Sequence, residues 1–432
     1  MEGFINVSPD TPLTKYCINA SNKEGDTFVG IKSEIIDGEH ELSICFPIGY
    51  EISEDEEVVR NEIIELISVL QEYNDDQSRI SKINPEQVLK TVRFPVQAYM
   101  TVILDYLNNG YYQITEEQFK QGISGPIHWP RTIKQEQPIV TRKGFVFPKY
   151  RVKQHNETDK DLITEINKYC VYQSHLRLGW IYKLPLPPKT GRVHNLDIYR
   201  QYLHDRILRT NLDKDKRLFQ SMLDILNFEN ALDNPNQFYF GTNTFEFIWE
   251  RLIQSTYGNV QKEYYLPRTK WLLKIGSEKD NTPLNPDTVM KVSGDVYILD
   301  AKYYKYGVSE KVSDLPNSAS INKQITYGEY VKVNEKFESE RKAGMQVYNA
   351  FLLPYNSRKD TYNIDEKIEN YYSIGEAVSE WKDSKECYQR VQGILVDVKW
   401  IIKNSIRPNE IEIIKLSNAI KKSLRENEKR KR

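Results

Sequence analysis

The sequence has few cysteines and no long apolar run, and both absences narrow the class of protein. Its four cysteines stand singly, without a Cys-x-x-Cys pair or the density of a disulfide scaffold, so we expect buried thiols. No stretch approaches the roughly 18 apolar residues of a membrane-spanning helix. The N-terminus lacks the basic start and apolar stretch of a signal peptide. We therefore expect a soluble, cytoplasmic protein with no membrane partner.

The chain also has almost no net charge and no nucleotide-binding loop. Its 60 Lys and Arg residues oppose 61 Asp and Glu residues, which leaves a net charge of -1. Attraction of the whole chain to nucleic acid is excluded, so any polyanion site must be a local patch. The absence of a GxxxxGK[ST] phosphate loop means that a P-loop NTPase would have to be a separate polypeptide.

The chain is long enough, and rich enough in aromatic residues, to form several folded domains. The 432 residues include 29 Tyr, 15 Phe and 6 Trp, which supply the apolar surface that a disordered chain lacks. We expect a multidomain α+β or α/β protein. The predicted regions are an α/β segment at 1–130, a basic β segment with a Pro-rich linker and helices at 131–235, and a C-terminal domain at 236–432.

The first region shows clear local signals. Two β-rich runs within 27–50 flank Asp37-Gly38, which predicts a hairpin. Residues 55–74 begin with acids and space apolar residues at helical intervals, so they predict a helix. A further helix is expected to open at Thr115, in a layout that resembles a winged helix.

The stretch 131–153 is basic. It carries seven Lys and Arg residues against the single acid Glu136, with aromatic residues interleaved. This composition suits a surface that contacts DNA phosphates, but a solvated hairpin with its aromatics on the core face is the preferred, simpler interpretation, because runs of charge usually lie on a solvated surface. The candidate DNA-binding residues are Arg142, Lys143, Lys149, Arg151 and Lys153.

An acid-bearing helix is predicted in the C-terminal region. In TFEFIWERLIQSTYG, residues 244–258, the apolar side chains form one stripe when turned about 100° per residue. On that wheel Glu246 lies at the edge of the stripe and Glu250 lies about 40° further toward solvent. Glu246 is therefore the preferred interior carboxylate, and Glu250 remains the alternative.

A second acidic element follows in the chain. Two strand-like runs flank Ser293-Gly294-Asp295 and predict a hairpin. Because side chains alternate along a strand, Asp300 and Lys302 should project to one side, and the hairpin should bring Asp287 beside them.

Two carboxylates and an ammonium that converge in this way indicate a specific chemistry. The carboxylates repel each other unless a cation lies between them. Oxygen ligands favour Mg²⁺, for which Mn²⁺ can substitute, and Lys302 would assist attack of water on a phosphodiester. The simpler interpretation is an exposed ion pair between Asp300 and Lys302, with Asp287 capping a turn.

These residues also resemble a family motif. Pro286-Asp287, twelve further residues and then Asp300-Ala301-Lys302 are similar to the signature of the PD-(D/E)xK nucleases. The resemblance implies a mixed sheet flanked by helices, with Asp287, Asp300 and Glu246 as metal ligands and Lys302 as a catalytic residue.

The chain after the motif fits the same order of elements. The resemblance implies a helix over 318–337 and a strand over 345–353. In several such nucleases this helix carries a Gln and a Tyr near the metal, four residues apart. Here Gln324 and Tyr327 are three apart, and Gln324 is an additional candidate site residue.

A narrower resemblance covers most of the chain. FEFIWE, PDTV, ILDAKYY and GPIHWPRTI together resemble the LlaJI-type restriction endonuclease subunits, which are related to McrC. This resemblance implies a subunit that cleaves double-stranded DNA and acts with a separate McrB-like AAA+ GTPase. GTP would be bound by that partner and not by this chain, and residues 1–130 would dock on it.

Two alternative functions remain open on the sequence. The protein could stimulate and position a partner NTPase without cleaving DNA itself. It could also be a DNA repair nuclease of the same superfamily. The intact set of Asp287, Asp300 and Lys302 favours cleavage, because clustered acids cost stability when no metal uses them.

Overall fold

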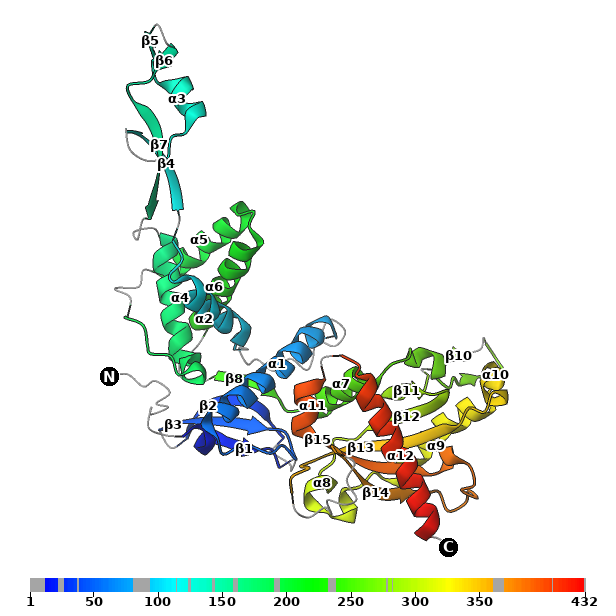
Figure 1. Ribbon diagram of the computed structural model, residues 1–432. Coiled ribbons are helices and arrows are strands. Elements are labelled where there is room, and N and C mark those ends of the chain that lie inside the picture. Colours follow the sequence, from blue (N-terminus) through cyan, green and yellow to red (C-terminus); the bar gives the residue numbers. More distant parts are fainter. Residues whose placement is uncertain are drawn as a thin grey trace. The chain divides into compact units, whose positions relative to one another are not determined.

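The computed structural model describes most of the chain (Figure 1). The described residues are 12–21, 27–36, 39–80, 94–113, 115–122, 126–141, 144–157, 162–189, 195–231, 238–276, 279–281, 283–359, 369–405 and 407–430. Within these ranges no helix combines the length and the apolar character needed to cross a membrane.

The chain forms two compact units, and one of them is discontinuous in sequence. The first unit holds the described residues 94–231, and the second combines 12–80 with 239–430. This division differs from the predicted regions 1–130, 131–235 and 236–432, because the N-terminal segment folds with the C-terminal domain. A helix that starts at Val96 belongs instead to the first unit.

The first unit is a group of helices with an extended β segment. Its longer helices are α2 (Val96–Asn109), α4 (Leu162–Leu178), α5 (Leu196–Arg209) and α6 (Asp213–Ala231). The extended segment contains β4 (Thr115–Gly122), α3 (Trp129–Gln135), β5 (Ile139–Thr141), β6 (Gly144–Val146) and β7 (Tyr150–Glu157). The prediction of a helix from Thr115 is wrong, since β4 pairs antiparallel with β7 and this long-range pairing overrides local propensity.

The second unit opens with a small sheet covered by a helix. Its strands are β1 (Cys17–Asn19), β2 (Val29–Ile36), β3 (Glu39–Phe46) and β8 (Phe238–Thr242), in the order β1-β3-β2-β8. The predicted hairpin is confirmed by the antiparallel pairing of β2 with β3, although Asp37 and Gly38 lie outside the described residues. The predicted helix at 55–74 is confirmed as α1 (Glu56–Ile80).

The C-terminal part of this unit is built on a five-stranded mixed sheet. Its strands are β11 (Thr288–Val292), β12 (Asp295–Ala301), β13 (Val347–Tyr355), β14 (Tyr371–Ala377) and β15 (Val391–Asp397). The order is β11-β12-β13-β15-β14, in which β12, β13 and β15 run parallel and the two edge strands run antiparallel to their neighbours. Mixed sheets and helices in separate blocks make the protein α+β.

Helices pack on this sheet and fix its central strands. The helices of this part are α7 (Phe245–Tyr257), α8 (Tyr306–Ser309), α9 (Ser318–Val333), α10 (Glu338–Lys342), α11 (Val398–Asn404) and α12 (Glu410–Arg430), and a short hairpin is formed by β9 (Lys270–Trp271) and β10 (Lys279–Asp280). The predicted helix after the motif is confirmed as α9 and the predicted strand as β13. α9 shares a core with β12 through Ile325, Val331 and Ile298.

A buried hydrogen bond joins the N-terminal sheet to the end of β12. The backbone N–H of Ile48 donates to the Tyr303 hydroxyl at 2.7 Å. The neighbouring Gly49 has a φ of 76°, and a Cβ on it would lie 3.1 Å from the Tyr355 backbone, so glycine allows the close approach. Lys399 of α11 adds a buried ion pair at 2.7 Å to Glu62 of α1.

We expect Tyr303→Phe to destabilise the second unit. The substitution keeps the ring but leaves the buried Ile48 N–H without its phenol partner, which costs about 1–3 kcal/mol. Urea denaturation of the full chain measures this loss, and Tyr304→Phe, a substitution at a partly exposed neighbour, is the control. Equal unfolding midpoints for the two variants would contradict the role given to this contact.

Candidate active site

The end of β12 brings the acidic side chain of Asp300 and the ammonium of Lys302 together. β12 is hydrogen-bonded to β11 on one side and to β13 on the other, so its backbone is held in place along its whole length. Val296 and Ile298 point into the core shared with α9, and alternation puts Asp300 on the same face. The Lys302 Nζ lies 2.5 Å from Oδ2 of Asp300, as the sequence predicted.

Asp287 is brought to the same place by the β11–β12 hairpin. It lies just before β11, one residue outside the pair formed by Thr288 and Leu299. Its Oδ2 accepts a hydrogen bond of 2.8 Å from the backbone N–H of Ala301. The expected convergence of Asp287 with Asp300 and Lys302 is therefore present in the structure.

The surroundings of Asp287 oppose its negative charge. Burial makes the largest contribution, and the nearby carboxylates Asp300 and Glu250 add to it, so that the pKa of Asp287 is raised to about 7. The Ala301 N–H and the Lys302 ammonium act in the opposite direction but do not compensate. A cation placed beside such a carboxyl would favour its ionised form.

Of the two candidate glutamates, Glu250 lies in the electrostatic surroundings of the aspartates. It is half-buried, and its pKa is raised by burial and by Asp300, while Lys302 lowers it. Glu246 is exposed. The structure thus reverses the preference for Glu246, because a helical wheel ignores position along the axis: Glu246 lies in the first turn of α7 and Glu250 one turn further on.

Lys302 keeps its proton in this environment. Burial by itself lowers the pKa of the ammonium, but ion pairing and hydrogen bonding to Asp300 outweigh this and raise it. Its backbone N–H donates to Leu352 O on β13 at 2.9 Å, which fixes the chain direction at the strand end. Lys302 is therefore held as a positive charge beside Asp300.

α9 brings Gln324 and Tyr327 against the same strands. The buried Gln324 donates from Nε2 to Ile298 O at 2.7 Å, and its Oε1 has no hydrogen bond within the described part of the chain. Tyr327 donates to Asn285 O at 2.9 Å, and its pKa is raised by burial and then by Asp300 and Asp287. Both side chains hold the backbone that leads into the two aspartates.

Lys262 is a further cation at the site that sequence reasoning missed. It lies in a short 3-10 helix after α7, and its Nζ donates to Asp287 O at 3.3 Å. Its charge also lowers the pKa of Glu250. Only its place between the acid-bearing helix and Pro286-Asp287 could have singled it out in the sequence.

The donor set fits a hard cation that keeps most of its water. Among the described residues no group of three or more His, Cys, Asp or Glu side chains is arranged as a complete metal site. Mg²⁺, however, is usually held by one or two carboxylates together with water and substrate phosphate. The half-buried Asp287 and the buried Asp300 supply two such carboxylates, and the raised pKa of Asp287 is consistent with a place for a cation beside it.

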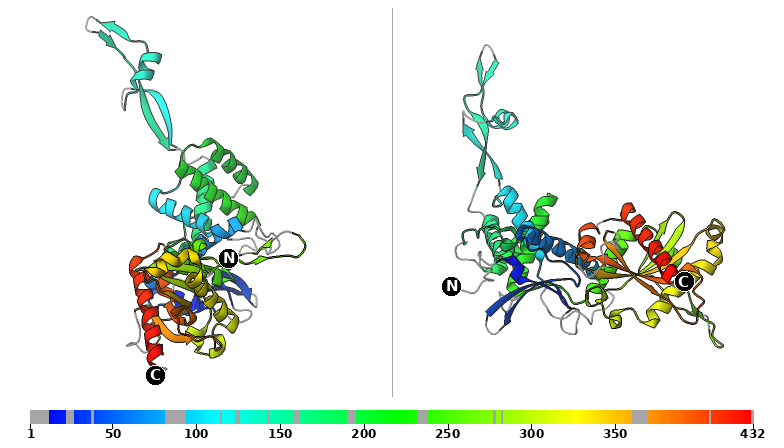
Figure 2. Two further views of the ribbon diagram at one scale, coloured as in Figure 1. Left: turned by 90° about the vertical axis from the view of Figure 1, so that its right-hand side faces the viewer. Right: turned by 60° about the horizontal axis from the view of Figure 1, so that its bottom comes forward.

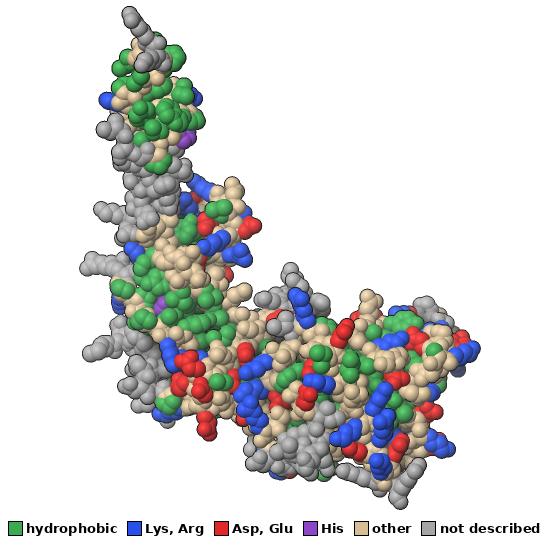
Figure 3. Space-filling model, in the orientation of Figure 1, with side chains coloured by type: hydrophobic (Ala, Val, Ile, Leu, Met, Phe, Trp, Pro, Cys, Tyr) green, Lys and Arg blue, Asp and Glu red, His purple; other side chains and the backbone are tan. Residues whose placement is uncertain are grey.

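The predicted DNA-binding residues belong to the other unit. Arg142 and Lys143 lie outside the described residues, as does the side chain of Lys153. Lys149 is exposed, and Nε of Arg151 is paired with Glu136 at 2.7 Å. Apolar side chains gather on the surface of the segment that carries β5 and β6, where Phe145 is 71% exposed and so does not form a core face (Figure 3).

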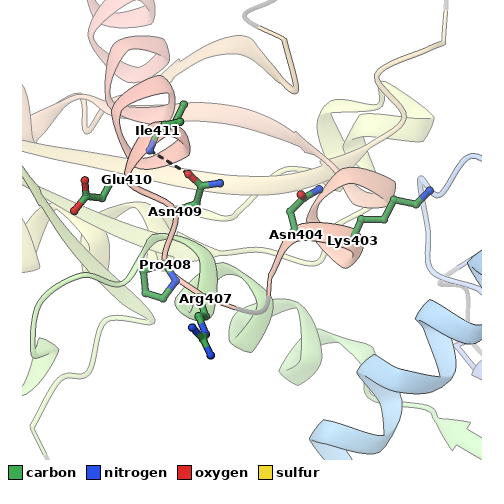
Figure 4. Close-up of a pocket in the computed structure, with 7 residues that line it drawn as sticks. All are labelled: Lys403, Asn404, Arg407, Pro408, Asn409, Glu410 and Ile411. Atoms are coloured by element: carbon green, nitrogen blue, oxygen red, sulfur yellow. Dashed lines mark hydrogen bonds between the residues drawn. The ribbon is translucent and has the colours of Figure 1, made fainter.

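A pocket of about 590 Å³ lies elsewhere in the second unit, between α11 and the start of α12. It contains none of the predicted site residues. Asn409 caps α12 by accepting from the Ile411 N–H at 3.1 Å (Figure 4). The lining residues are Lys403, Asn404, Arg407, Pro408, Asn409, Glu410 and Ile411.

Comparison with known proteins identifies a family. A family model described as the LlaJI restriction endonuclease matches residues 28–378, which include every residue of the candidate site. The comparison with curated proteins gave no match.

We expect the metal-free protein to lose stability as pH rises from about 4 to 7. The folded-state pKa of Asp287 is raised above its usual 3.8, so the folded protein binds the proton more tightly and this contribution disappears as pH passes about 7. Asp287→Asn removes this titration. Its melting temperature in EDTA should therefore fall less than that of the wild type between pH 5 and pH 8.

The control for this measurement is Asp280→Asn, at an exposed position in the same unit. It should keep the pH dependence of the wild type. An equal fall in melting temperature for the wild type and Asp287→Asn would count against the raised pKa.

Proposed function

The chain belongs to the LlaJI restriction endonuclease family, and we propose that it cuts double-stranded DNA with a metal-dependent centre formed by Asp287, Asp300 and Lys302. The family makes the protein a DNA-cleaving component of a restriction system. The proposal adds the residues, the metal and a PD-(D/E)xK type of core. In it Glu250 takes the place that the sequence gave to Glu246, as the helix-borne carboxylate.

One observation carries the proposal. The two halves of the motif, separated by twelve residues, meet at one strand end through the Ala301 to Asp287 hydrogen bond and the Lys302 to Asp300 ion pair. An incidental match to the motif would have no reason to converge in a buried place. The order of α7, β11, β12, α9 and β13 also agrees with the order implied for such a core.

Each residue then has a distinct role. Asp287 and Asp300 hold Mg²⁺, for which Mn²⁺ can substitute, and Glu250 adds negative charge beside them. When bound, the metal supplies Lewis-acid polarisation of the scissile phosphodiester. Lys302 stays protonated and offsets negative charge that develops on the phosphate as water attacks. Gln324 holds β12 in register for these side chains.

The partner completes the proposal. We infer a separate McrB-like AAA+ subunit that binds GTP and recognises DNA, since this chain has no phosphate loop of its own. A cytoplasmic location belongs to the same proposal. The exposed Lys149 in the first unit remains a candidate DNA contact.

We expect Asp300→Asn to abolish plasmid cleavage in Mg²⁺, by about 100-fold or more, because the substitution removes a metal-binding charge. The control is Asp295→Asn. Asp295 is also an ion-paired aspartate of β12, joined to Lys421 at 2.8 Å at the other end of the strand. Cleavage is measured with and without GTP and the partner NTPase.

The result separates two functions. If Asp300→Asn cuts DNA as fast as the wild type, the nuclease centre lies elsewhere. If neither protein cuts DNA but both change the GTP turnover of the partner equally, the chain is a non-cleaving activator.

We expect Glu250→Gln to reduce the cleavage rate more than Glu246→Gln does. Glu250 interacts electrostatically with Asp300, Lys302 and Asp287, whereas Glu246 is an exposed acid one turn away on the same helix. A loss of about 10-fold or more is expected for Glu250→Gln alone. The Mg²⁺ concentration needed for half-maximal rate should rise in the same variant. A larger effect of Glu246→Gln would restore the preference from the sequence.

A further inference from the structure

A hairpin between the acid-bearing helix and Asp287 exposes large apolar side chains. In the β9–β10 hairpin, Trp271 is 61% exposed, Leu272 68%, Leu273 51% and Ile275 92%. All residues from 268 to 276 are exposed. Figure 2 shows this hairpin projecting from the unit. Four large apolar side chains in one short exposed segment are more than a soluble surface normally carries, and they mark a contact surface.

The same segment is positively charged. Arg268, Lys270 and Lys274 alternate with the apolar residues, and residues 268–276 contain no acid, while Asp280 of the other arm stands opposite Lys270. The chain as a whole is almost neutral, so this is a local concentration of charge. Basic side chains next to an apolar wedge are the combination with which proteins contact DNA phosphates and enter between bases.

The base of the hairpin is anchored close to the catalytic residues. Leu284 N donates to Pro267 O and Asn281 N donates to Thr269 O, both at 3.0 Å, which holds the two arms together. Only two residues separate Leu284 from Asp287. The shortest path from Trp271 to Asp287 runs back along the chain to Pro267, across the hydrogen bond to Leu284 and on to Asp287. At about 3.3–3.6 Å per extended residue, this path spans at most about 30 Å. One turn of duplex DNA is about 34 Å long, so a duplex bound at the site is long enough to span that distance.

We propose that the β9–β10 hairpin is a DNA-contacting element, in which Lys270 and Lys274 bind phosphates and Trp271 and Ile275 enter a groove of the duplex beside the cleavage site. This inference rests on the proposed nuclease function and adds the surface that holds the substrate. The occupant is DNA and not an acidic protein, because the hairpin is connected to the strand that carries Asp287 and the substrate there is a polyanion.

The test measures binding separately from cleavage. A fluorescent 30-base-pair duplex is titrated with the full chain in EDTA, where no cutting occurs, and the affinity is read by anisotropy. The test variant combines Trp271→Ser with Ile275→Ser. The matched control combines Trp381→Ser with Val312→Ser, which removes an exposed Trp (76%) and an exposed aliphatic side chain (78%) from the same unit.

We expect the hairpin variant to bind at least about tenfold more weakly than the wild type, since aromatic and apolar contacts to bases carry that scale of affinity. The control should bind as the wild type does. A second variant, Lys270→Gln with Lys274→Gln, should reduce the slope of log affinity against log salt by about 2, because two phosphate contacts are lost. Melting temperatures should be unchanged in all three.

Different failures have different meanings. If the wild type binds and cleaves DNA and the hairpin variant binds equally well, the inference is overturned while the nuclease proposal stands. A variant that loses self-association in gel filtration but keeps its DNA affinity would also overturn it, in favour of a protein interface. If the wild type neither binds nor cleaves duplex DNA, the proposed function itself fails.

Discussion

The hydrogen bond from the Ala301 N–H to Asp287 is the contact on which the candidate site depends. It joins the residue before β11 to the end of β12 and so fixes two carboxylates, Asp287 and Asp300, at a spacing that neither strand could set alone. The arrangement costs stability, because burial and mutual repulsion raise the pKa of Asp287. A protein keeps such an arrangement when a cation compensates for it. The same bond therefore positions the acids and creates the demand for positive charge that Lys302 and Lys262 meet only in part.

Much of this site could be predicted from the sequence because it depends on local rules. Strand alternation put Asp300 and Lys302 on one side, and a hairpin signal placed Asp287 beside them. Both rules concern neighbours in sequence and were confirmed by the geometry. The helical wheel did less well, since it gives the direction of a side chain but not its height along the helix. Glu250 is half-buried and interacts electrostatically with Asp300 and Lys302, whereas Glu246 is exposed in the first turn, and only the packing of α7 distinguishes them.

Other parts could not be predicted because they depend on contacts between distant segments. β4 was expected to be a helix, and its pairing with β7 across a long insertion decided otherwise. The hydrogen bond between Ile48 and Tyr303 links residues 255 positions apart, so no local sequence pattern near either residue predicts it. Lys262 reaches the site through the fold of a short connecting helix. The Tyr303 contact has a clear effect: the N-terminal sheet is structurally part of the unit that carries β12 and the candidate site.

The discontinuity of the second unit bears on how the protein is made. Residues 12–80 are synthesised before the inserted unit, but β2 gains its neighbour β8 only after the whole of 94–231 has been synthesised. Domains tend to fold as they emerge, so the inserted unit can fold while its host is still incomplete. Asp287, Asp300 and the supporting strands β13 and β15 are synthesised later still. The candidate site can therefore assemble only after the whole inserted unit has been synthesised.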